Sequence, residues 1–228
     1  MDEEADEVFP AEDHLFEDSF SKECTFSFFG QECKINQSFS ASLGVAASVW
    51  DAAIHLCRFF EQISLDLSGK RVIELGAGTG FLSILAARLG ARVTLTDLPL
   101  AIPQAVRNIK ANTPMTGWPS EAPIAAPLCW GQDQENFSSD WDFVLGTDII
   151  YMPETFPLLL DTLVHLCGGG AMVFLSSKMR REHHTQDFYD NWLPQKFEVE
   201  LVQTEPESNI NIYKAALRAE GLTKTPKY

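Results

Sequence analysis

The chain has 228 residues, 45% of them hydrophobic and 21% charged, and a formal net charge of −15 at pH 7. This length suffices for one well-buried α/β domain and is short for two, and no 18-residue apolar run is present to span a membrane. The excess of acid and the lack of a Lys/Arg-rich stripe argue against DNA or RNA as substrate, so we expect a basic protein surface as partner.

The N-terminal 20 residues predict a flexible acidic leader, without the basic start and apolar core of a signal peptide. We therefore expect a cytoplasmic location. The cysteines form no C-x-x-C pair and no cluster with histidine, which predicts buried thiols and no metal site. A disulfide between Cys24 and Cys33 across a hairpin stays open as the alternative.

Residues 21–69 are expected to form an extension to the main fold. Aromatic and β-branched residues on both sides of Gly30-Gln31 predict a β-hairpin. A helix is then expected over residues 43–63, with Trp50 beside its apolar stripe. That stripe consists of Val45, Val49, Ala52, Ala53, Leu56 and Phe60.

From residue 70 to 228 strands alternate with helices, which predicts a doubly wound, mostly parallel α/β sheet. Strands are expected at 71–75, 92–97, 123–130, 141–150, 171–177, 197–203 and 209–217, and helices at 79–90, 99–113, 154–167 and 186–195. The last two strands have no helix between them and must form an antiparallel hairpin at one edge. The prediction is a single domain over residues 21–228 with a seven-stranded sheet.

A glycine loop follows the first core strand, in the stretch "VIELGAGTG". Gly76, Gly78 and Gly80 permit a tight turn and the close approach of a ligand to the backbone, although a tight turn alone would also explain them. Asp97 ends the next strand 19 residues after Gly78, where doubly wound folds bind ribose hydroxyls. The pair indicates a cofactor that contains adenosine.

Two residues near the loop bear on which cofactor it is. Phe81 is bulky where the nicotinamide fingerprint requires a small residue. Glu74 adds negative charge that disfavours a pyrophosphate and suits a cation. Both favour S-adenosyl-L-methionine, with S-adenosyl-L-homocysteine as product, over a nicotinamide cofactor.

The stretch "VIELGAGTGFLSILAARLGARVTLTD" resembles the first motif of the seven-β-strand (class I) methyltransferases, whose hallmark is the C-terminal edge hairpin. Together, "VWDAA", "ELGAGTG", "TDLP", "LCW", "DIIY" and "SKMR" resemble the methyltransferase-like 21 group of protein-lysine methyltransferases, closest to its B subtype, which acts on elongation factor 1-alpha. The resemblance covers nearly the whole chain.

The resemblance also implies the cofactor site. Trp50 would contribute to the pocket, Gly76, Ala77 and Gly78 would line the methionine and ribose, Asp97 would hold the ribose, and Trp130 would flank the adenine. Thr147 stands where relatives often carry alanine, so only its backbone is expected to contact the cofactor.

Asp148 and Tyr151, in "FVLGTDIIY", end a central strand and are the expected catalytic residues. Asp148 would bind and orient the lysine ammonium. It would not act as a general base, because a carboxylate favours the charged amine. Tyr151 would wall the lysine channel. A loop cap by Asp148 with Tyr151 packed on it is the structural alternative.

Other polar residues after the fifth core strand receive less weight. We interpret His183 and His184 as exposed polar residues, and a solvated loop explains Lys178, Arg180 and Arg181 as well as the motif does.

The resemblance thus implies a monomeric, S-adenosylmethionine-dependent protein-lysine N-methyltransferase that acts on elongation factor 1-alpha and needs no metal. The alternatives are a different protein substrate, such as an Hsp70-type chaperone, and a cofactor-binding scaffold without catalysis.

Overall fold

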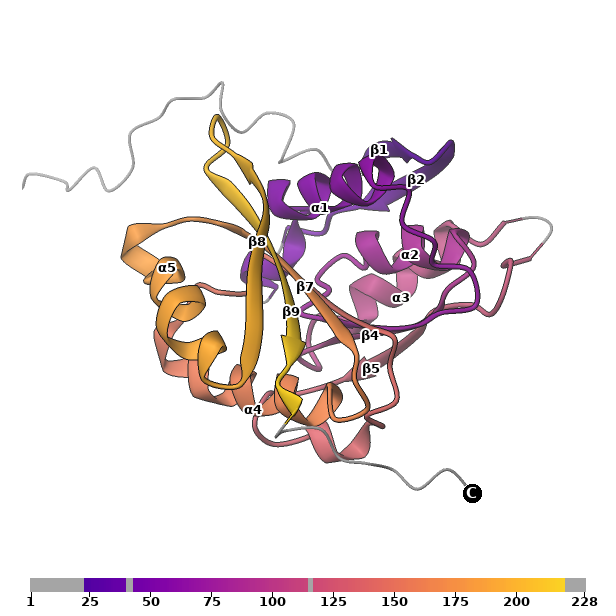
Figure 1. Ribbon diagram of the computed structural model, residues 1–228. Helices are drawn as coiled ribbons and strands as arrows, with labels where there is room; N and C mark the ends of the chain where they lie inside the picture. The colour runs from indigo at the N-terminus through magenta and orange to yellow at the C-terminus, as the bar shows by residue number, and fades with distance from the viewer. Residues whose placement is uncertain (1–22, 40–42, 115–116, 220–228) are drawn as a thin grey trace, which may run out of the picture.

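The computed structural model describes residues 23–39, 43–114 and 117–219, so the predicted leader, residues 1–20, lies outside the described residues. Its centre is a seven-stranded sheet in the order β5-β4-β3-β6-β7-β9-β8 (Figure 1). The strands are β3 (Arg71–Leu75), β4 (Arg92–Asp97), β5 (Ile124–Pro127), β6 (Phe143–Thr147), β7 (Met172–Lys178), β8 (Phe197–Glu205) and β9 (Ile210–Leu217).

Five of these strands are parallel, whereas β9 pairs antiparallel with both β7 and β8. The predicted doubly wound sheet and its antiparallel C-terminal hairpin are therefore confirmed. Strand β8 is the outer edge, with a register shift between Leu201 and Gln203. Such an irregularity twists an edge strand and makes it a poorer template for pairing with another chain.

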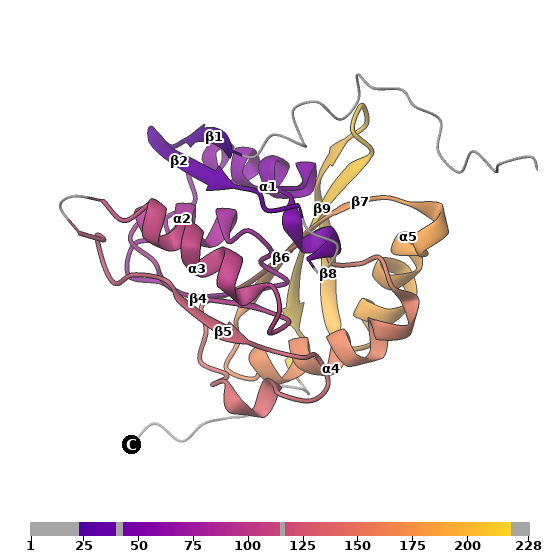
Figure 2. The same ribbon diagram turned by 180° about the vertical axis from the view of Figure 1, so that it is seen from behind.

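Helices cover both faces of the sheet (Figures 1 and 2). One face carries α1 (Asp51–Gln62), α2 (Phe81–Arg88) and α3 (Ile102–Ala111). The other carries α4 (Phe156–Leu166) and the helical run of α5 (Thr185–Asp187), η5 (Phe188–Trp192) and η6 (Leu193–Gln195). Short 3-10 turns complete the chain: η1 (Gly44–Ala47), η2 (Gln134–Asn136), η3 (Pro153–Thr155) and η4 (Arg181–His183).

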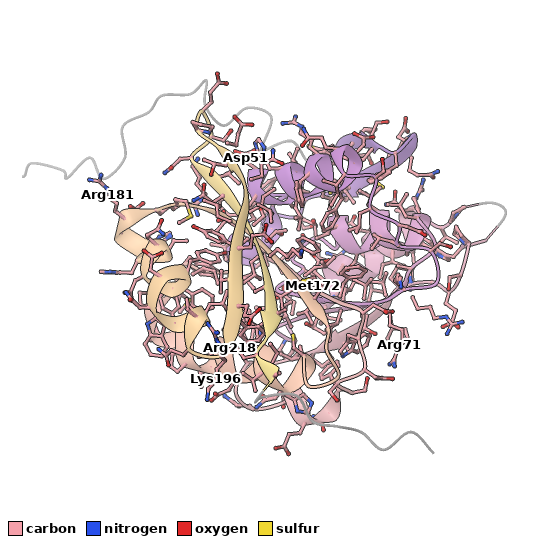
Figure 3. All side chains as sticks on the ribbon, viewed as in Figure 1. Asp51, Arg71, Met172, Arg181, Lys196 and Arg218 are labelled. Atoms are coloured by element: carbon pink, nitrogen blue, oxygen red, sulfur yellow. The ribbon has the colours of Figure 1, made fainter. Side chains whose placement is uncertain are left out.

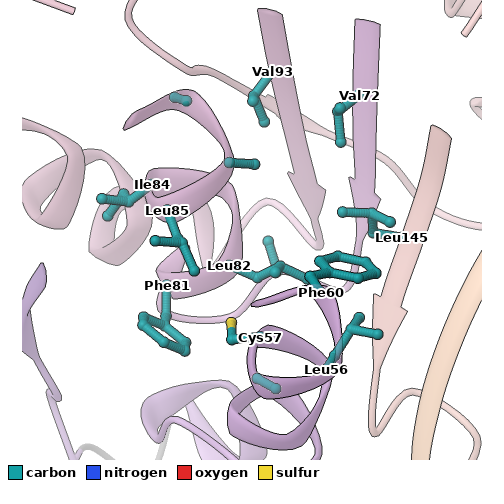
Figure 4. Close-up of a cluster of buried hydrophobic side chains, with 14 of the residues drawn as sticks. Leu56, Cys57, Phe60, Val72, Phe81, Leu82, Ile84, Leu85, Val93 and Leu145 are labelled. Atoms are coloured by element: carbon teal, nitrogen blue, oxygen red, sulfur yellow. The ribbon is translucent and has the colours of Figure 1, made fainter. Parts of the chain in front are cut away.

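Burial on both faces explains why the central strands are continuously apolar rather than alternating. In β3, Val72 belongs to the cluster under α1 and α2, and its neighbour Ile73 belongs to the cluster under α4. Figure 4 shows Phe60 of α1 and Leu82 of α2 packing toward these strands. Both side chains are at most 2% exposed.

The predicted helix over residues 43–63 is wrong in its first third. Residues 44–47 form the 3-10 turn η1, and Ser48 and Trp50 are extended before α1 begins at Asp51. The reason is tertiary: the Val49 N–H donates to Gln37 Oε1 at 2.9 Å instead of to a helical carbonyl. Val45 consequently leaves the core and is 52% exposed.

The remaining predicted helices and strands form, with ends that differ from the prediction by up to three residues. Helix α3 begins at Ile102, so Pro103 lies in its first turn and Pro99 precedes the helix. The predicted helix at 186–195 is helical throughout, but it changes from α to π to 3-10 geometry near Pro194.

The predicted hairpin is confirmed as β1 (Glu23–Phe28) and β2 (Gln31–Asn36). Cys24 pairs with Ile35 and Cys33 with Phe26, so the two cysteines lie two residues apart in register. They form no disulfide, and the Gln37 side chain donates to Cys24 Sγ at 3.1 Å.

Three side-chain amides, two in α3 and one from its C-cap residue Asn112, bind the open edge of β2 and the residues after it. Asn108 accepts from the Asn36 N–H and donates to the Asn36 carbonyl, at 2.9 and 3.0 Å. Asn112 makes the same pair of bonds with Lys34, at 2.9 and 2.7 Å, and Gln104 Oε1 accepts from Ser38 N–H at 3.0 Å. This amide ladder, Gln104–Asn108–Asn112, attaches the N-terminal hairpin to the core without a paired strand.

Candidate active site

A cavity of about 470 Å³ lies at the carboxyl ends of the parallel strands, where doubly wound sheets bind ligands. It stands at the switch in strand order between β3 and β6. The structure brings all ten predicted site residues together in its wall: Trp50, Glu74, Gly76, Ala77, Gly78, Asp97, Trp130, Thr147, Asp148 and Tyr151.

The glycine loop after β3 forms the floor of the cavity. Gly76 has φ +61°, and a Cβ there would lie 2.6 Å from Ile149 Cγ2, so no larger residue fits without a shift. The Gly78 N–H donates to Asp97 Oδ2 at 2.7 Å, and the Leu98 N–H donates to Asp97 Oδ1 at 2.7 Å. Each oxygen of Asp97 keeps a lone pair, so the carboxylate can also accept the two hydroxyl protons of a ribose.

Glu74 lies beneath this loop and is 1% exposed. Its carboxylate accepts a hydrogen bond from the Ser83 hydroxyl. Burial raises the pKa of Glu74 to about 8, more than the bonds from Ser83 lower it. Burial therefore favours the protonated carboxyl at pH 7, whereas a cation beside it would favour the carboxylate. The negative charge that the sequence predicts at Glu74 thus depends on the ligand.

Two tryptophans line the cavity from different segments. Trp50 stands just before α1, 39% exposed, and its Nε1–H donates to the Val45 carbonyl at 2.8 Å. The break in the predicted helix thus turns η1 and Trp50 into a wall of the cavity. Trp130 follows β5, half-buried, and its ring reaches to 3.8 Å from the position of a Cβ on Gly76.

Asp148 follows β6 and has a left-handed backbone, φ +54°, which is uncommon outside glycine. Its N–H donates to the Ser176 carbonyl at 2.8 Å. Its side chain is 6% exposed and forms a bidentate ion pair with Arg180, each N–O distance 3.0 Å. The Lys178 N–H adds a bond of 3.1 Å to Oδ1.

Tyr151 and Thr147 complete this side of the cavity. Burial, followed by the charges of Asp97 and Asp148, raises the pKa of the Tyr151 phenol, so the ring stays neutral at physiological pH. The Tyr151 ring meets His183 edge-on, with centroids 6.3 Å apart. Thr147 is half-buried as the last residue of β6.

Sequence reasoning gave too little weight to Arg180 and His183. Both line the cavity, and His183 Nδ1 is buried without a hydrogen-bond partner among the described residues. The expectation of an exposed histidine pair holds only for His184. The "SKMR" match was a usable signal for Arg180, whereas no pattern distinguished one histidine from the other.

Solved structures share this fold. The chain aligns with a Thermus thermophilus 16S rRNA N2 G1207 methyltransferase, solved with AdoMet and guanosine, at a TM-score of 0.60 and 20% identity. The alignment covers 86% of this chain and 50% of that one, so this chain spans half the length of that protein. At this identity the likeness shows the fold alone.

The family model described as lysine methyltransferase matches residues 29–192. The chain belongs to the lysine methyltransferase family. This methyltransferase is 51% identical to EEF1A lysine methyltransferase 3 of Xenopus tropicalis over 91% of its length and 92% of the relative's. It is 40% identical to protein N-lysine methyltransferase METTL21A of Mus musculus, over 85% and 87% of the two chains. The resemblance to the methyltransferase-like 21 group is thereby confirmed, and the protein is a protein-lysine N-methyltransferase.

No group of three or more His, Cys, Asp or Glu side chains is placed to hold a metal ion within residues 23–39, 43–114 and 117–219. In the same part of the chain, no helix has the length and apolar character needed to cross a membrane.

Proposed function

We propose that this enzyme methylates the side-chain amine of a lysine in elongation factor 1-alpha, with S-adenosyl-L-methionine as methyl donor. The observation that carries the proposal is the convergence of the ten site residues on one cavity. The elongation factor is inferred from the relative that is 51% identical and carries that substrate in its name. The net charge of −15 suits a basic protein partner and disfavours nucleic acid.

The cavity fits the cofactor in three respects. Its volume lies within the roughly 300–1,000 Å³ of small-molecule sites. Asp97 offers two carboxylate oxygens, already oriented by backbone N–H groups, for the ribose. Glu74 gains its negative charge when a cation such as a sulfonium or ammonium comes near. We assign Trp130 to the adenine, and Gly76, Ala77 and Gly78 to the ribose and methionine.

When bound, the cofactor supplies a methyl group: the lone pair of the amine forms the N–C bond, the C–S bond breaks with its electrons left on sulfur, and the product ammonium loses a proton to water. Trp50 and η1 form one side wall of the cavity. Tyr151 supplies an aromatic wall for the lysine. Asp148 orients the amine beside it, and Thr147 contributes its backbone.

The test is transfer of a labelled methyl group to purified elongation factor 1-alpha, followed by mass mapping of the modified lysine. An Hsp70-type chaperone is the competing substrate. Asp148→Ala is expected to reduce transfer at least about a hundredfold, the scale of a lost positioning contact. Labelling of the chaperone alone would refute the substrate, and full activity of a folded Asp148→Ala variant would remove Asp148 from the mechanism.

We further propose that the enzyme works as a cytoplasmic monomer. Cys33, Cys57 and Cys167 are buried thiols outside any disulfide, and a reducing compartment keeps cysteines in that form. Light scattering of the purified chain and imaging of a tagged chain in cells test the two parts separately.

A further inference from the structure

Asp148, the carboxylate proposed to orient the target amine, is already bound to a cation of the chain itself. Arg180 follows β7, and its two terminal nitrogens each lie 3.0 Å from a different oxygen of Asp148. The guanidinium also lies 5.7 Å from the centre of the Trp50 ring, within cation–π range. Arg180 is thus held from both sides, with its side chain 20% exposed.

Apart from this pair and the rings of Tyr151 and His183, the described part of the cavity wall has three titratable groups, and none of them is a cation that could neutralise Asp148. The titratable and charged groups of the cavity wall are Glu74 of β3, Asp97 of β4, Cys129 after β5, Asp148 and Tyr151 after β6, Arg180 after β7 and His183 of η4. Among the described residues of this wall, Arg180 is the one guanidinium or ammonium. It is paired with Asp148 rather than with Glu74 or Asp97.

This pairing bears on the protonation of a lysine. Methyl transfer needs the neutral amine, because an ammonium has no lone pair, and a free lysine has a pKa of about 10.4. A lone carboxylate beside the amine would favour the ammonium and oppose the reaction. A guanidinium bound to that carboxylate cancels its field, and arginine stays charged throughout the physiological range.

The pairing also leaves room for a neutral amine. A carboxylate offers about four lone-pair sites. Lys178 N–H and Arg180 occupy two on Oδ1, and Arg180 occupies one on Oδ2. The remaining site on Oδ2 can accept a single N–H, which a neutral amine donates while its own lone pair stays free.

We propose that Arg180 is a positioning residue that neutralises Asp148, so that the site receives the target lysine as a neutral amine rather than trapping it as an ammonium. This inference rests on the proposed function for its substrate. The role of Arg180 itself is open to a measurement that needs no substrate.

The substrate-free test compares two ligands of the cofactor site by calorimetry: S-adenosyl-L-homocysteine, and sinefungin, which carries a primary amine where the donor carries its methyl-sulfonium. In Arg180→Gln the bare carboxylate should favour the protonated amine. The ratio of sinefungin to S-adenosyl-L-homocysteine affinity at pH 7.5 should rise about fivefold or more. The matched control is Arg181→Gln, because Arg181 is exposed and points away from the body of the molecule (Figure 3). Its ratio should stay within about twofold of wild type.

Removal of Arg180 leaves a buried carboxylate uncompensated and can impair folding. Two further variants cover that outcome. The double variant Arg180→Gln/Asp148→Asn removes both charges and should return the ratio to the wild-type value. Asp148→Asn alone leaves the guanidinium unopposed and should lower the ratio. An unchanged ratio in folded Arg180→Gln, or in Asp148→Asn if the former does not fold, overturns the proposal.

The second test is the pH dependence of kcat for lysine methylation at saturating substrate, because kcat reports groups that titrate in the enzyme–substrate complex. In Arg180→Gln the pH of half-maximal activity should rise by about one unit, and most of the lost rate should return above about pH 9.5. A merely structural role would reduce the rate by the same factor at every pH, and that result overturns the proposal. A wild-type enzyme that methylates no lysine of elongation factor 1-alpha, while the sinefungin ratio responds as expected, refutes the proposed substrate and leaves the role of Arg180 standing.

Discussion

Asp97 performs two tasks with one carboxylate. Its oxygens accept the N–H groups of Gly78 and Leu98, and these bonds fix the glycine loop against the end of β4. Asp97 also lines the cavity. The residue that is proposed to bind the ribose therefore also holds the loop that approaches it.

Replacement of Asp97 by Asn should weaken cofactor binding about 10- to 100-fold, the equivalent of one or two charged hydrogen bonds. Calorimetric titration with S-adenosyl-L-homocysteine measures the loss. The matched control is Asp142→Asn, since Asp142 likewise accepts a backbone N–H, from Arg71 at 2.8 Å, but lies outside the cavity wall. Equal effects of the two substitutions would argue against a ribose contact.

Glu74 predicts a pH dependence of stability with a definite sign. Its folded pKa of about 8 lies above the ordinary value of 4.5 for an unburied carboxyl. The stabilisation is complete below the unfolded pKa and is lost as pH rises toward the folded one, because the unfolded chain then releases a proton that the folded chain keeps. At about 1.4 kcal/mol per pKa unit, the loss is on the order of a few kcal/mol.

Urea unfolding at pH 5.5 and pH 8 measures this effect. The free energy of unfolding of the wild type should decrease from pH 5.5 to pH 8. That of Glu74→Gln, which cannot ionise, should decrease less. A saturating concentration of S-adenosyl-L-methionine should reduce the difference, since its positive charge favours the carboxylate. Parallel pH profiles for wild type and Glu74→Gln would contradict the assignment.

At the scale of elements, the amide ladder predicts which substitution most weakens the attachment of the N-terminal hairpin to the core. Asn108 is fully buried and bonds the Asn36 N–H, the Asn36 carbonyl and the Thr79 carbonyl. Asn108→Ala leaves those backbone groups without partners and should cost about 2–4 kcal/mol of unfolding free energy.

Chemical denaturation checks this value against Asn191→Ala. Asn191 is also a helical asparagine with a side-chain bond, to Asp187 at 2.7 Å, but it is exposed. Its replacement should change stability by no more than about 0.5 kcal/mol. A loss of similar size in both variants would mean that the ladder contributes no more than a surface contact.

The strands and helices that could be predicted from the sequence are those whose buried residues follow a regular spacing along the chain. The strands buried on both faces and the helices that cover them follow from apolar runs and their spacing. The start of α1 could not be predicted in this way, because it depends on one hydrogen bond between Gln37 and Val49 that no local pattern reveals. Tertiary contacts override helical propensity at such points.

The candidate site likewise has features that the sequence predicts and features that only the structure shows. Gly76, Asp97 and Asp148 stand at strand ends, where the topology of a doubly wound sheet places ligands, so their convergence could be predicted. The partnership of Asp148 with Arg180 joins residues 32 positions apart and required the structure. The charge of Glu74 also required it, since burial determines the pKa.

For the whole molecule, the net charge of −15 predicts how the enzyme meets a basic protein. Long-range attraction accelerates encounter and is screened by salt, with a Debye length of about 10 Å at 0.1 M. Between 50 and 300 mM NaCl, kcat/KM for the protein substrate should fall severalfold, roughly in line with steered association.

The matched measurement is the affinity for S-adenosyl-L-homocysteine over the same salt range, which should change less than about twofold because this ligand carries no net charge. A salt-independent kcat/KM would mean that the acidic surface plays no part in substrate capture.

The amide ladder also limits how the chain can vary in length. Four helical residues advance about 6.0 Å and two strand residues about 6.6–6.8 Å, so Gln104, Asn108 and Asn112 keep step with Ser38, Asn36 and Lys34. One inserted residue in α3 would rotate the next amide by about 100°, away from its partner. Insertions and deletions should therefore be tolerated in the loops around this pair of elements, and excluded between the rungs.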